Sequence, residues 1–334
     1  NDWFDDIQYQ IRHNIVIKTK KDNSFTQMSE YYINNFNWKS SATHKDDGKY
    51  HDHIKNWIEH QNITEVNTAS LKSLRDDYLP NITESKNTIA HWFNYIRKVY
   101  RFHLENNLIT KDEVPDFPKL SKNASKRIFL DKGQYRKLIS KSIDRMNEPS
   151  LNRKTQFVRK TLNRFIIFQV ATGMRIKETH NLTWDQITEK VNSKRERYLE
   201  IEVLNTKTKK DRTVVSKPQA VYALKELKEV YLQYQDQFTK LNLDKNKVFP
   251  FRFSGSNNQL LKSADLYEDK ILGKKRDIYV YRHTYISWAV LSGEPVTGIA
   301  FQVGNSVPTI EKHYINFLNA THFVDTLSSL KIIK

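Results

Sequence analysis

The sequence predicts a mainly helical chain with a small antiparallel β-sheet, an α+β protein built from two domains. Three observations lead to this fold class. The chain has 334 residues, which suffices for about two domains. Hydrophobic residues recur at helical spacing along most of it, and one pair of short segments shows the alternation of strands. Since 38% of the residues are hydrophobic, the chain can fill a sizeable core.

The first residues predict a polar N-terminal extension. We expect it to cover residues 1–47, with one helix over 26–36. Residues 40–49 are rich in Ser, Thr, His, Asp and Gly, a composition that predicts a loop. A separate domain is therefore expected to begin at residue 48.

That domain is predicted to be a small helical bundle over residues 48–114. Its longest helix is expected over 85–106, where apolar residues form one continuous face. Pro115 and Pro118 then predict an extended linker over 115–128, because proline disfavours helix at its own position and at the preceding one. The second domain should cover the rest of the chain.

The second domain, residues 129–334, is predicted to mix helices with one hairpin. Residues 197–204 alternate strictly between apolar and polar side chains, as a strand does, and 212–215 form a second run after a basic turn. Helical spacing predicts helices over 131–146, 153–172 and 220–241, two short helices within 279–309, and a last helix that begins near Pro308 with Ser306 as its N-cap.

The net charge of +17 lies almost entirely in the second part of the chain. Residues 1–126 hold 18 basic and 17 acidic side chains, whereas residues 127–334 hold 37 and 21. A positive field of this kind attracts polyanions, most commonly nucleic acid. A surface that only confers solubility is the alternative.

Two absences narrow the function. The chain has no Cys, which excludes a disulfide framework, a thiolate zinc site and a cysteine nucleophile, and which fits a reducing compartment. No apolar run approaches 18 residues, and the first residues lack the pattern of a signal peptide. We therefore expect a cytoplasmic protein with no membrane partner.

Four short motifs in the basic part stand out together. They are 171–178 (ATGMRIKE), 206–209 (TKTK), 281–284 (YRHT) and 303–306 (VGNS), the last followed by a tyrosine at 314. Their order and spacing resemble the catalytic domain of the tyrosine recombinases, the phage integrase family, from residue 129 to about 330. The resemblance implies that residues 48–114 are a helical, SAM-like core-binding domain and that 129–334 are a mixed catalytic domain with a C-terminal tail.

The resemblance implies a reaction and a role for four residues. The family transfers a DNA phosphodiester to an enzyme tyrosine, here Tyr314, and forms a 3′-phosphotyrosine. Arg175 and Arg282 would stabilise the charge that develops on the phosphate oxygens, since a guanidinium stays charged and grips phosphate with two donors. Lys207 would protonate the leaving 5′ oxygen as general acid. No cofactor and no metal is expected.

Two positions depart from the family pattern. Tyr279 and Asn305 stand where the family has histidines, and both can donate a hydrogen bond to phosphate but cannot shuttle protons as imidazole does. We expect Glu178 to orient the first arginine through a salt bridge. His283 and His313 are supporting residues, and we expect His283 to be a core histidine satisfied by backbone.

DNA contacts are predicted from clusters of basic residues. The helix over 85–106 is the candidate for groove entry in the first domain, although its cations could equally coat a solvated face. The predicted DNA-binding residues are Lys86, Arg97, Lys98, Arg101, Lys209, Lys210, Arg212, Lys274, Lys275 and Arg276.

The resemblance also implies partners. They are double-stranded DNA with specific recombination sites, a dimer on one site, a tetramer in the synaptic complex, and accessory DNA-bending proteins. The apolar segment from Phe323 would pack onto a neighbouring protomer. The biological role would be integration or excision of a phage or another mobile element. The protein would be encoded by such an element or be associated with the bacterial nucleoid. The alternatives are a type IB topoisomerase, a catalytically weak DNA-binding regulator on a recombinase scaffold, and an RNA-binding protein, which only the charge supports.

Overall fold

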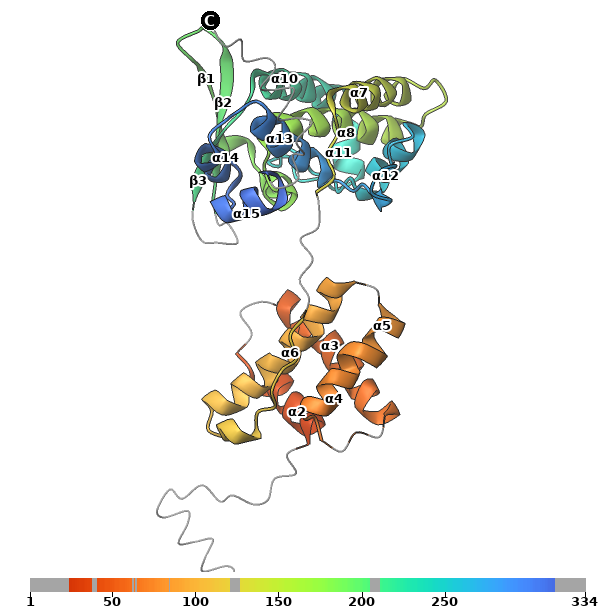
Figure 1. Cartoon of the computed structure of the whole chain (residues 1–334). Coiled ribbons are helices and arrows are strands. Elements are labelled where there is room, and N and C mark those ends of the chain that lie inside the picture. Colours follow the sequence, from red (N-terminus) through yellow and green to blue (C-terminus); the bar gives the residue numbers. More distant parts are fainter. Residues whose placement is uncertain are drawn as a thin grey trace, which may run out of the picture. The chain divides into compact units, whose positions relative to one another are not determined.

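The chain folds into two compact units, residues 1–123 and 124–334 (Figure 1). A computed structural model describes residues 24–37, 41–61, 63, 65–83, 85–120, 127–204 and 211–315. Both units are mainly helical in these ranges, and the strands found there all belong to the second unit. The predicted fold class, mainly α with a small antiparallel sheet, is confirmed. Within the same ranges, no helix combines the length and the apolar character needed to cross a membrane.

The first unit is a helical bundle around one aromatic core. Apolar side chains of its helices, among them Phe25, Trp57 and Phe93, are buried together. Its described elements are α2 (Phe25–Asn35), α3 (Ser41–His60), α4 (Thr68–Ser73), the π-helical turn η1 (Leu74–Tyr78), α5 (Leu79–Ile82), α6 (Lys86–Glu105) and the 3₁₀ turn η2 (Lys111–Glu113).

The loop predicted over residues 40–49 is wrong, because α3 already begins at Ser41. The polar first turns of this helix are held by long-range bonds to a buried carboxylate. Asp47 accepts hydrogen bonds from Tyr32 Oη at 2.9 Å and from Lys98 Nζ at 2.8 Å. Helices α2 and α3 therefore share one core with α6, and the boundary expected at residue 47 falls inside α3. Lys98, predicted to bind DNA, is an ion-pair partner within the bundle.

The second unit contains more elements than the sequence predicts. The predicted helices over 131–146 and 153–172 are confirmed, whereas 220–241 is divided at Tyr234. Its described elements are α7 (Lys132–Met146), α8 (Arg153–Thr172), α9 (Ile176–Asn181), η3 (Trp184–Gln186), β1 (Ile187–Val191), β2 (Arg197–Val203), β3 (Arg212–Val215), α10 (Pro218–Gln233), α11 (Gln235–Lys240), α12 (Ser254–Ser263), β4 (Glu268–Asp269), β5 (Lys274–Lys275), α13 (Val280–Leu291), α14 (Val296–Val303) and α15 (Val307–His313).

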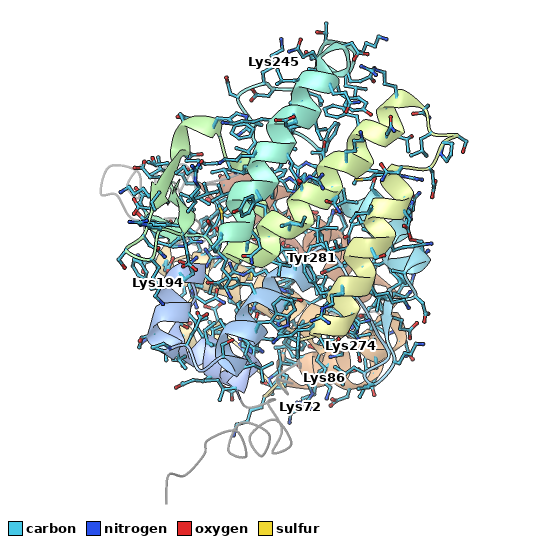
Figure 2. The ribbon with its side chains drawn as sticks, turned by 90° about the horizontal axis from the view of Figure 1, so that it is seen from above. Lys72, Lys86, Lys194, Lys245, Lys274 and Tyr281 are labelled. Atoms are coloured by element: carbon cyan, nitrogen blue, oxygen red, sulfur yellow. The ribbon has the colours of Figure 1, made fainter. Side chains whose placement is uncertain are left out.

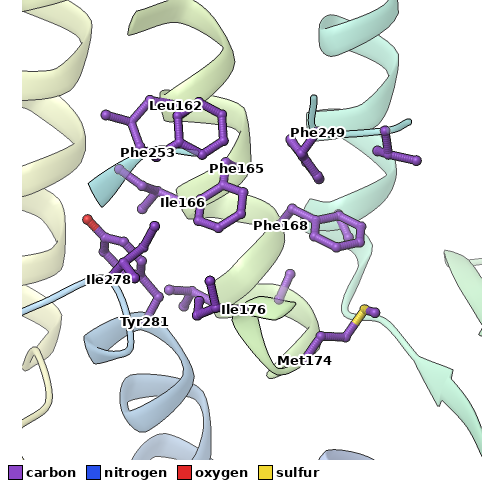
Figure 3. Packing of buried hydrophobic residues seen from close by; sticks show 14 of the residues in the cluster. Leu162, Phe165, Ile166, Phe168, Met174, Ile176, Phe249, Phe253, Ile278 and Tyr281 are labelled. Atoms are coloured by element: carbon purple, nitrogen blue, oxygen red, sulfur yellow. The ribbon is translucent and has the colours of Figure 1, made fainter. Parts of the chain in front are cut away.

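Helix α8 is the centre of the second unit. It packs against α7, α10, α12 and α13, and apolar residues on several of its faces are buried. Figure 3 shows Phe165, Ile166 and Phe168 of α8 among side chains from distant segments, including Phe249 and Tyr281. A helix with buried residues on several faces has little freedom to shift. The residues that follow its C-terminus are therefore held firmly in place.

A three-stranded antiparallel sheet in the order β1-β2-β3 lies beside these helices. The alternation predicted for β2 is confirmed, since Leu199, Ile201 and Val203 are buried and Glu202 is exposed. The pairing of Val203 with Arg212 brings the start of β3 beside the end of β2. The predicted turn, residues 205–210, lies outside the described residues.

Gly173 ends α8 in a left-handed conformation, with φ at 65°. A Cβ at this position would lie 2.3 Å from Tyr285 Cδ1. We expect Gly173→Ala to lower the free energy of unfolding by about 2–5 kcal/mol, from backbone strain together with overpacking. Urea denaturation measures this effect.

Gly293 provides a matched control for that substitution. Its φ is 76°, but a Cβ there would meet nothing within 4 Å. Gly293→Ala should therefore cost only the backbone strain, about 1–2 kcal/mol. An equal loss in the two variants would contradict the role given to Tyr285.

Candidate active site

Arg175 is placed by the turn after α8. Gly173 reverses the chain, and Arg175 then occupies the N-cap position of α9. Glu178, one turn into that helix, accepts hydrogen bonds from the Arg175 backbone N–H at 2.9 Å and from its Nη1 at 2.8 Å. The salt bridge expected between these two residues is present.

Arg282 approaches the same turn from α13. It is only 4% exposed and donates to the carbonyls of Gly173 at 2.7 Å and Val303 at 2.8 Å. Burial, followed by the neighbouring charge of Arg175, lowers the pKa of Arg282 to about 10. The guanidinium therefore stays charged at neutral pH.

Two helix ends explain how two arginines can lie so close together. Gly173 follows the last residue of α8, while Val303 and Gly304 end α14, and Gly304 accepts a hydrogen bond from Arg175 Nη2. The carbonyls at a helix C-terminus carry partial negative charge, which stabilises cations. The fold thus directs two such termini at two guanidiniums and offsets the cost of burying like charges.

Asn305 connects the two arginines. Its Oδ1 lies 3.1 Å from Arg282 Nη2 and 3.4 Å from Arg175 Nη2. Since the amide oxygen faces these donors, the NH₂ group is left to donate elsewhere. The other residue at a departing position, Tyr279, is 44% exposed at the N-cap of α13, three residues before Arg282.

Tyr314 ends α15 with its ring buried to 6% exposure. Its hydroxyl lies 2.7 Å from His283 Nδ1. Burial raises the pKa of Tyr314 to about 12, although Arg282 and Arg127 act in the opposite direction. The expectation that His283 is satisfied by backbone is wrong for Nδ1, because its partner is the Tyr314 hydroxyl.

His283 is a neutral imidazole whose Nδ1 lies within hydrogen-bond distance of the Tyr314 hydroxyl. Burial, followed by the positive charges of Arg127 and Arg282, lowers its pKa to about 3. A neutral imidazole can accept the phenolic proton at Nδ1 and carry its own proton on Nε2. In that tautomer, Nδ1 would be a fixed acceptor for the Tyr314 hydroxyl.

The pKa of His283 predicts how stability depends on pH. The unfolded chain gains a proton at this residue below about pH 6.5, but the folded chain does so only near pH 3. The stability contributed by neutral His283 is thus complete above pH 6.5 and is lost as the pH falls, by up to about 1.4 kcal/mol per pH unit. Urea unfolding at pH 7 and pH 5 measures this loss.

His283→Asn is the control for that measurement. Asparagine can still accept the Tyr314 hydroxyl through its side-chain oxygen but does not titrate. Between pH 7 and pH 5 the wild type should lose about 2 kcal/mol more than this variant. Equal losses would show that His283 protonates in the folded chain as readily as in the unfolded one.

Two arginines that were predicted to bind DNA are buried in ion pairs. The Arg212 side chain is 6% exposed and contacts Glu178 at 2.7 Å, and Arg276 is 2% exposed and contacts Asp269 at 2.7 Å. Strand alternation could have predicted that the Arg212 side chain is buried, since Arg212 lies two residues before buried Val214 and thus on the same face of β3.

Several other predicted contacts remain on the surface. Lys86, Arg101, Lys274 and Lys275 are exposed, and Arg97 stacks on Phe117. Figure 2 shows other lysines, such as Lys194 and Lys245, at the outer edge of the second unit and Tyr281 inside it. The predictions Lys207, Lys209 and Lys210 lie outside the described residues. His313 is in the last turn of α15, next to Tyr314.

Comparison with known proteins adds a family and a set of similar folds. The model of the phage integrase family matches residues 129–314, a range that ends at Tyr314. No curated protein sequence matches the chain.

Solved structures with a similar fold include three complexes with DNA. The XerH site-specific recombinase bound to its difH substrate has a TM-score of 0.56 and 16% identity, over 92% of this chain and 94% of that one. The Tn1549 transposon integrase in complex with circular intermediate DNA has a TM-score of 0.62 and 14% identity, over 92% of this chain and 99% of that one. A lambda integrase dimer bound to a COC′ core site has a TM-score of 0.60 and 12% identity, over 84% of this chain and 93% of that one.

Proposed function

This chain belongs to the phage integrase family, the tyrosine recombinases, which cleave and rejoin DNA strands through a covalent intermediate, and on that premise we propose that Tyr314 is its nucleophile. Arg175 and Arg282 would bind the non-bridging oxygens of the scissile phosphate. The observation that carries the proposal is the convergence of both guanidiniums on Asn305, while the Tyr314 hydroxyl lies beside the histidine that follows Arg282.

The proposed site suits phosphoryl transfer because its cations are preorganised. Charge builds up on the phosphate oxygens in the transition state, and fixed donors in a partly buried site stabilise it without reorganising. Carbonyls at two helix ends hold both guanidiniums in place. Asn305 would add a neutral donor through its NH₂ group, and Tyr279 would reach a phosphate oxygen with its hydroxyl.

The proton balance assigns further roles. As the Tyr314 oxygen bonds to phosphorus, its proton would pass to His283 Nδ1, at 2.7 Å. Burial is the main cause of the low pKa of His283, and nearby cations lower it further; the negative charge of a phosphodiester would oppose the effect of those cations. The bond from phosphorus to the 5′ oxygen breaks, and Lys207 would protonate that oxygen, as the family resemblance implies. Reversal of these steps joins a new 5′-hydroxyl end.

We further propose that the substrate is duplex DNA with a specific recombination site. The basic second unit would supply most of the phosphate contacts, and the near-neutral first unit would supply groove contacts and register. The same proposal includes the assembly: a dimer would bind one site, and a tetramer would form at synapsis with the help of DNA-bending proteins. It also includes the setting, which would be cytoplasmic, with a mobile element or at the nucleoid.

A trapping experiment tests this function. The protein is incubated with a pool of nicked duplexes of randomised sequence, in which the 5′-hydroxyl fragment diffuses away after cleavage. The expected result is a denaturant-resistant DNA–protein adduct, with Tyr314 identified as the linked residue by peptide mass and the cleaved sequence read from the attached strand. Absence of any adduct would favour a DNA-binding regulator. Joining of two such sites, rather than relaxation of supercoils alone, separates a recombinase from a topoisomerase.

A further inference from the structure

Arg212 is a cation whose side chain is buried. Its side chain is 6% exposed, and each of its three nitrogens donates to a protein oxygen. Nη2 and Nη1 reach the two carboxylate oxygens of Glu178 at 2.7 and 3.0 Å, and Nε reaches the Gln302 carbonyl at 3.2 Å. The guanidinium is therefore bonded to groups of the protein itself.

Glu178 lies between two cations. Its Oε1 accepts from Arg175 Nη1 at 2.8 Å as well as from Arg212. A Cβ on Gly304 would lie 2.9 Å from Arg212 Cζ and 3.0 Å from Arg175 Nη1, so both guanidiniums border the same glycine. One negative charge is thus shared by two positive ones. Without Arg212, the carboxylate would act on Arg175 alone.

The ionisation of Glu178 agrees with this arrangement. Burial works against its charged form, but hydrogen bonds and charge from Arg212, followed by those from Arg175, hold its pKa below the ordinary value. Glu178 is therefore ionised at neutral pH, with both Arg212 and Arg175 bonded to its carboxylate.

We propose that Arg212 is a positioning residue that neutralises Glu178, so that Glu178 orients Arg175 without cancelling the positive charge that Arg175 presents to the scissile phosphate. The inference rests on the proposed function, in which Arg175 binds that phosphate. A carboxylate fixes the plane of a guanidinium, but it also weakens the pull of that guanidinium on an anion. A second buried cation removes this conflict.

A charge-balance experiment tests the proposal on the nicked duplex recovered with wild-type protein. In Arg212→Met, Glu178 keeps its charge beside Arg175, and we expect single-turnover cleavage to slow about 100-fold. The double variant Arg212→Met with Glu178→Gln loses both charges, and we expect it to cleave at least tenfold faster than Arg212→Met. A purely structural role predicts the reverse, because the second substitution removes further bonds. A double variant no faster than the single one would overturn the proposal.

DNA binding provides a second readout. The slope of log affinity against log salt, measured on a short duplex of arbitrary sequence, should be the same for wild type and Arg212→Met. A slope smaller by about 0.9 would mean that Arg212 contacts a phosphate itself, and the proposal would be wrong. If Arg212→Met does not fold, Arg212→Gln takes its place, since glutamine is uncharged but can still donate to Glu178.

The ion pair of Arg276 with Asp269 is the matched control. It is also buried, its N–O distance is also 2.7 Å, and its other hydrogen bonds go to the carbonyls of Leu266 and Glu268. Arg276→Met should lower stability, and adding Asp269→Asn should not accelerate cleavage.

The proposed function and the proposed role of Arg212 can be refuted separately. A wild type that forms no adduct at Tyr314 refutes the function, whereas an adduct-forming wild type with an equally fast Arg212→Met refutes only the inference.

Discussion

Replacing Tyr314 by phenylalanine is expected to abolish the covalent DNA adduct. The substitution removes the one oxygen that would attack phosphorus, so cleavage should fall to background. The ring stays in place, and His283 loses its hydroxyl partner at 2.7 Å, which should cost about 1–3 kcal/mol of stability. Trapping on the nicked duplex pool measures the chemistry, and urea unfolding confirms that the variant is folded.

Tyr281→Phe is the matched control for this experiment. Tyr281 is also buried, and its hydroxyl also has a side-chain partner, Asn257. Since it lies in the core next to Arg282, its loss should affect stability but leave the adduct intact. The chain has 17 tyrosines, so the identity of the linked residue matters. An adduct formed by Tyr314→Phe would assign the nucleophile to another of them.

Replacing Arg282 is expected to have the next largest effect. Arg282→Lys keeps a positive charge but cannot bridge the Gly173 and Val303 carbonyls and Asn305 as the planar guanidinium does. We expect single-turnover cleavage to slow by about 100-fold to 1,000-fold, the range found when a preorganised donor to a transition state is removed. Arg282→Ala should be slower still, because it also removes the positive charge that the lysine variant keeps.

Arg276→Lys provides the comparison for Arg282→Lys. Arg276 is a buried arginine of the same unit that also donates to backbone carbonyls. Both lysine variants should lose stability, but only Arg282→Lys should lose the chemical step. A wild-type cleavage rate in Arg282→Lys would show that Arg282 acts only in folding.

Much of the fold could be predicted because the signals are local. Gly173 ends α8 in a left-handed turn and Gly304 does the same for α14, and a glycine at a helix end is a signal that lies in the local sequence. The start of α3 could not be predicted. Its polar first turns are stabilised through Asp47 by Tyr32 and Lys98, the latter 51 residues away.

The sequence by itself determined the fold class, the concentration of positive charge in the second unit and the order of the motifs that carry Arg175, Arg282 and Tyr314. Only the tertiary structure decided which acidic groups the buried basic side chains pair with. In the sequence, Arg212 looks like one more cation of a basic turn, but in the structure it forms an ion pair with Glu178. His283 likewise contacts Tyr314, which is 31 residues away. The reason is physical: the pKa and role of a charged group depend on desolvation and on partners within a few ångströms, and spacing along the chain does not specify those partners.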